Sequence, residues 1–407
     1  MKLRCAWKHV FWVSVLVGAM ATSGLGQGPP EVSWKAYADD STAQSLAFSP
    51  DGDILASGSY RRVIFWRASD GGLIHDFGDQ RALPKVAFSP EGSVFASTAL
   101  DVIRLWDLSD FSLIRSMSAD FASGIWSIAF SPDGTLLAAG GGIYTRDKEV
   151  RLFRVSDGEL LRSFNAASGA VVTDFSPDGS LLVCGSGVAG DIRVFQLSDG
   201  SLIRTLATEH SVTGVAFSPS DADVLASCGA DSQVRVWRIS DGSLIRAMPV
   251  PNIPTHVDFS PDGTLLIAGS YRYITILRTA DGSVDRTYDE FRGEPFVWST
   301  IFSPDDLHFA YSTGHNGKIF LARKQNPGDC QPAITLSLAC KPTNNVIVAK
   351  LTGVEIGQTV TVNASCDGSK EATANDRGKA RAKFKNVKVA GCEITVTGCP
   401  DLADSCP

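Results

Sequence analysis

A short turn motif, Phe-Ser-Pro, recurs along this chain at a nearly constant interval and limits the possible folds more than any other feature. It begins at Phe48, Phe88, Phe130, Phe175, Phe217, Phe259 and Phe302. The intervals between copies are 40, 42, 45, 42, 42 and 43 residues. A period of this length indicates one supersecondary unit used many times, because each unit buries its apolar faces only against its neighbours. The repeat therefore predicts seven similar units.

Each unit has the pattern of four short strands. Residues 171–206 read VVTDFSPDGSLLVCGSGVAGDIRVFQLSDGSLIRTL. Val, Ile, Leu and Phe fill the four strand segments, where branched and aromatic side chains are favoured. Pro, Asp and Gly fill the turns SPDG and SDG, where a fixed or positive φ is needed. The unit is therefore an antiparallel sheet with two repeated turns.

These features resemble the WD-repeat β-propeller family over residues 31–324. The best single match is residues 215–248, and the Trp-Asp pair itself is present at Trp106-Asp107. The resemblance implies an all-β, seven-bladed β-propeller. A propeller without catalytic groups usually serves as a platform for a protein partner, and no cofactor is expected.

The N-terminal segment EVSWKAYADD, residues 31–40, precedes the first complete unit. The last unit stops at GKIFLARK, residues 317–324, without a closing strand. The strand missing from the C-terminal end of the repeat region matches the extra strand at its N-terminal end. We therefore expect residues 31–40 to complete the last blade, which removes the exposed sheet edge that invites aggregation.

The first 26 residues have the plan of a secretory signal peptide. Lys2, Arg4 and Lys8 precede the apolar run VFWVSVLVGAMA, which is too short to cross a bilayer and ends in small residues. Cleavage is expected after Ala21 or after Gly26. A membrane anchor is the alternative interpretation. The pattern predicts a secreted or periplasmic protein.

A second domain is expected after a linker at residues 325–332. Residues 333–407 alternate apolar and polar side chains, which is typical of a small antiparallel β-sandwich. An even number of cysteines in a short exported segment indicates a disulfide framework rather than a zinc site, and six cysteines allow fifteen arrangements. The disulfide candidates are Cys330, Cys340, Cys366, Cys392, Cys399 and Cys406.

One segment of this tail, RGKARAKFK, places a cation at every second residue. On a strand such residues share a face. They either protect an edge strand from pairing or dock the tail onto an anionic surface, such as an acidic polysaccharide or phospholipid headgroups. Residues 328–407 have a net charge of +1 and residues 27–327 of −11, so we expect no nucleic-acid binding by the propeller. The candidate polyanion-binding residues are Arg377, Lys379, Arg381, Lys383 and Lys385.

The fifth unit contains His210, Ser227, Asp231 and Trp237, which suggest a catalytic triad at first sight. WD repeats place a structural hydrogen-bond network at the matching positions, so the resemblance implies that these residues brace the blade. No GxSxG or phosphate-binding glycine motif accompanies them, and the six histidines lack metal-ligand spacing. We therefore expect no catalytic residue and no metal site.

The loops opposite the repeated turns vary between units, and recognition usually resides in such loops. Tyr and Arg, the side chains most typical of binding hot spots, gather there. The interpretation is an exported, non-enzymatic platform; the alternatives are a propeller enzyme with a central site, such as a lactone hydrolase, and an envelope-anchored structural protein. Solvated loop residues that fill gaps between blades would show the same pattern. The candidate partner-binding residues are Tyr60, Arg61, Arg62, Tyr144, Arg146, Tyr271, Arg272, Tyr273 and His315.

Overall fold

The structure is a computed structural model. It describes residues 13–17, 30–38, 42–79, 84–142, 148–166, 170–187, 190–289, 296–314, 317–324, 334–341, 346–352, 359–364, 368–373, 379–385, 392–396 and 399–406. The chain divides into two units. One is Ser23–Lys324, and the other combines Met1–Thr22 with Gln325–Pro407.

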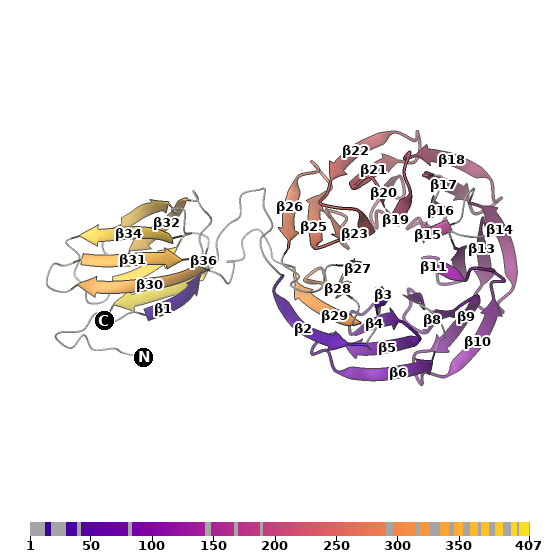
Figure 1. Cartoon of the computed structure of the whole chain (residues 1–407), viewed down its shortest axis with the longest axis horizontal. Coiled ribbons are helices and arrows are strands. Elements are labelled where there is room, and N and C mark those ends of the chain that lie inside the picture. The colour runs from indigo at the N-terminus through magenta and orange to yellow at the C-terminus, as the bar shows by residue number, and fades with distance from the viewer. Residues whose placement is uncertain are drawn as a thin grey trace. The chain divides into compact units, whose positions relative to one another are not determined.

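The larger unit is a closed ring of seven antiparallel sheets, each with four described strands, which confirms the predicted seven-bladed propeller (Figure 1). Blades 1 and 2 contain β3 (Ala43–Phe48), β4 (Ile54–Ser59), β5 (Arg62–Arg67), β6 (Leu73–Asp79), β7 (Val86–Phe88), β8 (Val94–Ala99), β9 (Val102–Asp107) and β10 (Leu113–Ser118). Blades 3 and 4 contain β11 (Ile125–Phe130), β12 (Leu136–Gly141), β13 (Glu149–Arg154), β14 (Leu160–Asn165), β15 (Ala170–Phe175), β16 (Leu181–Ser186), β17 (Asp191–Gln196) and β18 (Leu202–Ala207).

The remaining blades follow the same order from the ring axis outward. Blades 5 and 6 contain β19 (Val212–Phe217), β20 (Val224–Gly229), β21 (Gln233–Arg238), β22 (Leu244–Pro249), β23 (Pro254–Phe259), β24 (Leu265–Ser270), β25 (Tyr273–Arg278) and β26 (Val284–Tyr288). Blade 7 contains β27 (Val297–Phe302), β28 (His308–Thr313) and β29 (Lys318–Arg323), and its outer strand is β2 (Val32–Tyr37).

The N-terminal strand β2 closes the ring. It pairs antiparallel with β29, so that Lys35 lies opposite Phe320 and Tyr37 opposite Lys318. The Trp34 side chain is 8% exposed and packs with Leu46 and Trp66 of blade 1. Its indole Nε1 donates to the carbonyl oxygen of Ala68 at 2.6 Å. The first strand of the ring thus links its last blade to its first.

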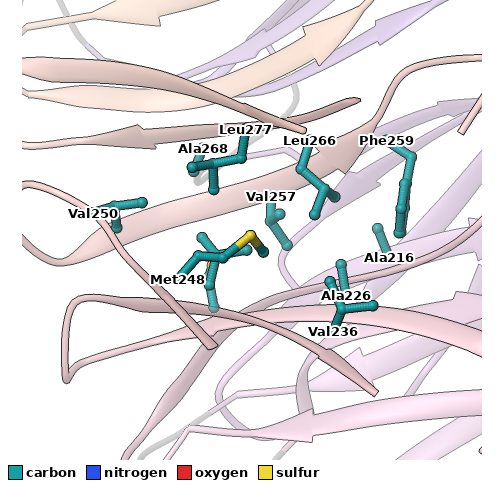
Figure 2. Packing of buried hydrophobic residues seen from close by; sticks show 12 residues of the cluster. Ala216, Ala226, Val236, Met248, Val250, Val257, Phe259, Leu266, Ala268 and Leu277 are labelled. Carbon is teal, nitrogen blue, oxygen red and sulfur yellow. The ribbon is translucent and has the colours of Figure 1, made fainter. Parts of the chain in front are cut away.

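The core lies between neighbouring blades rather than within one blade. Figure 2 shows the cluster between blades 5 and 6, where Val236 and Met248 of one blade pack with Val257 and Leu266 of the next. Each sheet is covered on both faces, so its second strand is buried along most of its length instead of alternating. Small residues occupy this strand where blades approach most closely. A Cβ on Gly58 would lie 2.1 Å from the carbonyl oxygen of Pro84 in blade 2.

The SPDG turns account for part of the acidity. In blade 3, the Ser131 hydroxyl donates to Asp133 at 2.6 Å and accepts the Leu136 amide at 2.9 Å. The same bonds recur at Ser176 and Asp178 in blade 4. The serine hydroxyl and a backbone amide hold the pKa of each aspartate below its usual value. These carboxylates therefore serve the turns.

The smaller unit contains two antiparallel sheets of four described strands each (Figure 1). One sheet has the order β1-β30-β31-β34 and the other β33-β32-β35-β36. The apolar run predicted to belong to a signal peptide contains β1, which pairs with β30. Packing of the two sheets as a sandwich and the disulfides stay predictions. The strands are β1 (Val13–Val17), β30 (Ile334–Lys341), β31 (Val346–Thr352), β32 (Thr359–Ala364), β33 (Gly368–Thr373), β34 (Lys379–Lys385), β35 (Cys392–Val396) and β36 (Cys399–Cys406).

Three residues of the predicted tail sites lie outside the described residues, namely Cys330, Cys366 and Arg377. The part of the chain that the structure describes is built of strands and turns. No helix in it is long and apolar enough to cross a membrane.

Candidate functional site

The hairpins between the second and third strands of the blades form one end of the ring. In an antiparallel blade, this end is opposite to the SPDG and SDG turns. The β4–β5 hairpin has Tyr60 and Arg61 at its tip, and the β24–β25 hairpin has Tyr271 and Arg272 at the same two positions. All four side chains are exposed. We call these four residues the tip surface.

Both arginines of the tip surface hold an unfavourable backbone conformation. The φ angle is 67° at Arg61 and 68° at Arg272. This left-handed region favours glycine or asparagine, and it costs other residues roughly 1–2 kcal/mol. A hairpin selected for stability alone would place glycine there. Leu100 and Ser232 in the equivalent hairpins of blades 2 and 5 also have positive φ angles, so what sets blades 1 and 6 apart is the shared Tyr-Arg pair.

The blade 6 tip is held by its neighbours. The Asn252 side-chain amide donates to the carbonyl oxygen of Tyr271 at 2.9 Å. The Tyr271 ring meets the Phe296 ring edge-on at 4.9 Å, and Phe296 stacks on Trp298 at 5.6 Å. This support fixes the Tyr271 ring before any partner arrives, which lowers the entropy cost of binding.

Two other residues predicted for this surface, Arg62 and Tyr273, are part of the blade structure. The Arg62 guanidinium donates to the carbonyl oxygen of Ala38 at 3.0 Å and forms an ion pair with Asp76. Tyr273 begins strand β25 and is half-buried. Tyr144, Arg146 and His315 lie outside the described residues.

The same end of the ring carries apolar side chains that the sequence analysis did not single out. Leu100 at the β8–β9 tip is 53% exposed, Ile253 before β23 is 49% exposed, and Trp126 on β11 is 37% exposed. Leu100 also has a positive φ, of 57°. Aligning the seven units on their Phe-Ser-Pro motif would have found Leu100, because its position in the blade 2 hairpin is equivalent to that of Tyr60 in the blade 1 hairpin.

The four residues of the predicted structural network are only partly joined. The Trp237 indole Nε1 donates to the Ser227 hydroxyl at 2.8 Å, and this pair recurs as Trp66–Ser57 and Trp106–Ser97. Asp231 forms an ion pair with Arg235 instead. His210 is exposed beside them. Since Ser227 is 1% exposed and already bonded to the indole, this group does not resemble a catalytic triad.

Two carboxylates lie on the inner strands around the ring axis. Asp174 and Asp258 occupy the same position in blades 4 and 6, directly before the Phe of each Phe-Ser-Pro motif. Each accepts an amide from the inner strand of the next blade: Phe217 at 2.7 Å and Phe302 at 3.1 Å. Burial raises the pKa of Asp174 to about 6 and that of Asp258 to about 7.

A second pair of titratable groups belongs to the same region. Burial lowers the pKa of His256 on β23 to about 4 and that of Lys85, just before β7, to about 8. The positive charge of Lys85 in blade 2 also lowers the pKa of His256 in blade 6. Groups from blades 2, 4 and 6 therefore influence one another across the axis. We call Lys85, Asp174, His256 and Asp258 the axial residues.

The axial residues were not predicted from the sequence, because it does not show that groups from blades 2, 4 and 6 come together around the ring axis. Each keeps partial contact with solvent while the ring surrounds it. Within the described ranges, no group of three or more His, Cys, Asp or Glu side chains could hold a metal ion. Cys184 and Cys228 are buried elsewhere, and burial raises the pKa of each thiol to about 12.

Comparison with known protein families agrees with this architecture. The family model described as WD domain, G-beta repeat matches residues 33–67, 111–154, 158–196, 200–238 and 248–284. The first match begins in β2, the outer strand of blade 7, and ends with β5 of blade 1. The sequence repeat is thus offset by one strand from the blade. None of the curated proteins matches the chain. WD-repeat propellers are common protein-interaction scaffolds, and this chain belongs to the WD-repeat β-propeller family.

Proposed function

We propose that the protein is exported and acts as a non-enzymatic platform that binds a protein partner at the tip surface. One observation carries the proposal: two hairpins, on blades 1 and 6, present the same Tyr-Arg pair on a strained turn. Only blade 7 separates these hairpins in the closed ring. The signal-peptide pattern of residues 1–26 supports export.

The side chains of the tip surface indicate the chemistry of the partner. Two tyrosines offer flat apolar area with a hydroxyl, at a low cost in side-chain entropy. Two guanidinium groups offer paired donors that match carboxylates. The complementary surface is therefore one with acidic side chains around an apolar centre. The exposed Leu100 and Trp126 extend the apolar part toward blades 2 and 3.

A pair of arginine variants tests the proposal. The Arg61→Ala, Arg272→Ala double variant should weaken partner capture from an extracytoplasmic extract by about 2 kcal/mol or more for each true hot spot. Arg67 and Arg278 provide the matched control, since they are exposed arginines at the opposite ends of the same strands, β5 and β25. The control double variant should capture normally. Equal capture by both double variants would place the partner elsewhere.

The axial residues favour a second candidate function, acid–base catalysis near the ring axis. Perturbed pKa values often mark catalytic sites. However, the Asp174 and Asp258 carboxylates already accept backbone amides that link neighbouring blades, which explains their presence without chemistry. Turnover of model lactones or esters that is abolished by His256→Gln but not by Arg61→Ala would favour this candidate over the platform.

A further inference from the structure

The strand register gathers cations from three strands onto one face of the sheet β1-β30-β31-β34. Lys379, Arg381, Lys383 and Lys385 alternate along β34 and therefore share a face. The β31 residue opposite Arg381 is Lys350. Lys385 lies opposite Val346, and Val346 lies opposite Lys341 on β30. Residues directly opposite in a sheet share a face, so Lys350 and Lys341 join the four. We call these six residues the cationic face.

The other face of the same sheet is apolar. It carries Ile334, Leu336 and Leu338 on β30, and Ala380, Ala382 and Phe384 on β34, in register with Ile347, Ala349 and Leu351 on β31. The four strands contain no acidic residue. Burying six cations would be far more costly than burying the apolar face. The apolar face is therefore the one suited to packing, and the cationic face the one suited to water.

Protection of an edge strand does not explain this arrangement. Basic residues on an edge strand discourage pairing with other chains, and β34 is the last strand of its sheet. Lys350, however, belongs to β31, which is paired on both sides, with β30 and with β34. Lys350 therefore guards no edge. Its place beside Arg381 in the cationic face needs another reason.

We infer that the cationic face binds a linear acidic polysaccharide, which would hold the exported platform at an anionic envelope or matrix. The inference rests on the proposed export. Cations on alternate residues of a strand repeat every 6–7 Å or so, which suits a polymer with regularly spaced anionic groups. The other described residues of this face on β30 and β31 are aliphatic or polar, namely Thr335, Ser337, Ala339, Val346, Val348 and Thr352. They offer no aromatic anchor for a bilayer, so we favour the polysaccharide over a lipid surface.

The test uses the chain from residue 27 to 407 and heparin as a model linear polyanion. Wild type should be retained at low salt and released as salt rises, because counterion release and screening weaken the contacts. Lys350→Ser should elute at lower salt, with a slope of log affinity against log salt reduced by about one. The matched control is Lys370→Ser, which removes one lysine from β33 of the other sheet and should elute like wild type.

Three results would overturn the inference: no retention of wild type, equal loss in both single variants, or binding to phosphatidylglycerol vesicles but not to heparin. Lys379→Ser with Lys383→Ser provides a further check. If these residues only guard an edge, this variant should self-associate without losing heparin affinity. Partner capture at the tip surface should be normal in Lys350→Ser, so failure here leaves the platform proposal standing. Conversely, heparin binding by a chain that is never exported would overturn the platform's proposed location alone.

Discussion

A few single residues of this molecule differ from the repeat in ways that stability alone does not explain. Arg61 and Arg272 hold positive φ angles at exposed tips, and Asp174 and Asp258 replace the small apolar residue found before Phe in most other units. The two kinds of departure differ in effect. The arginines raise the energy of a turn, whereas the aspartates bond to the next blade.

Relief of backbone strain should separate stability from binding at the blade 6 tip. Arg272→Gly removes a left-handed arginine, so the free energy of unfolding should stay equal or rise by up to about 1 kcal/mol. Capture of the partner should fall in the same variant. Urea unfolding and capture measured on one preparation check both effects. A variant that loses stability but keeps its capture would show that Arg272 serves the fold.

The axial carboxylates should make stability depend on pH. The folded-state pKa of Asp258, about 7, lies above its unfolded value, so the folded state binds more protons between these values. Stability contributed by the protonated form is therefore lost as pH rises through that window. His256, with its folded pKa lowered to about 4, acts in the opposite direction, gaining stability as pH rises from about 4 to 6.5.

Asp258→Asn isolates the carboxylate, because asparagine keeps an oxygen to accept the Phe302 amide. Relative to wild type, this variant should be more stable at about pH 8 than at about pH 5. Urea titrations at the two pH values measure the difference. The same difference in stability at both pH values would show that Asp258 does not titrate in this range.

At the scale of elements, the closing strand β2 joins the last blade of the ring to the first. Trp34→Ala removes a buried indole between blades 7 and 1 and should cost about 3–5 kcal/mol of unfolding free energy. Val32→Ala in the same strand is the control, since Val32 is 38% exposed and its loss should cost little. Deleting residues 31–40 should go further by exposing the edge of β29 and promoting association. A monomeric deletion variant with unchanged melting would contradict ring closure by β2.

The second element to test is the β35–β36 hairpin. Its register places Cys392 opposite Cys406. Directly opposed residues of an antiparallel pair have Cα atoms about 4.5–5.5 Å apart, within the range of about 4.4–6.8 Å for disulfides. Of the fifteen possible disulfide pairings of the six cysteines, we expect one of those that link Cys392 to Cys406. Peptide mapping of the exported, unreduced protein should find Cys392 linked to Cys406. A link from Cys392 to Cys399 or to any other cysteine would contradict the register.

For the molecule as a whole, the sequence predicted those features that arise from repeated local motifs. The blade number follows from the Phe-Ser-Pro period, and five of the seven turns, those of blades 1, 3, 4, 6 and 7, repeat the same Ser-Asp bond. The Tyr-Arg tips were visible in the sequence because the same two residues occupy the same variable position in two of the seven units. The axial residues were not visible, because Lys85 and His256 come close enough to interact only when the ring brings distant inner strands together. Lys350 was missed in the tail for a similar reason, as only the register of β31 with β34 places it beside Arg381.

The most direct test of the platform proposal is site-specific photocrosslinking of the whole exported chain. A photoreactive amino acid replaces Tyr60 or Tyr271 at the tips, or Ser201 in an exposed SDG turn at the opposite end of the ring. After irradiation in extracytoplasmic extract, we expect one and the same adduct from positions 60 and 271 and none from position 201. An adduct from position 201 alone, or no adduct from either tip, would contradict a partner-binding role for the tip surface.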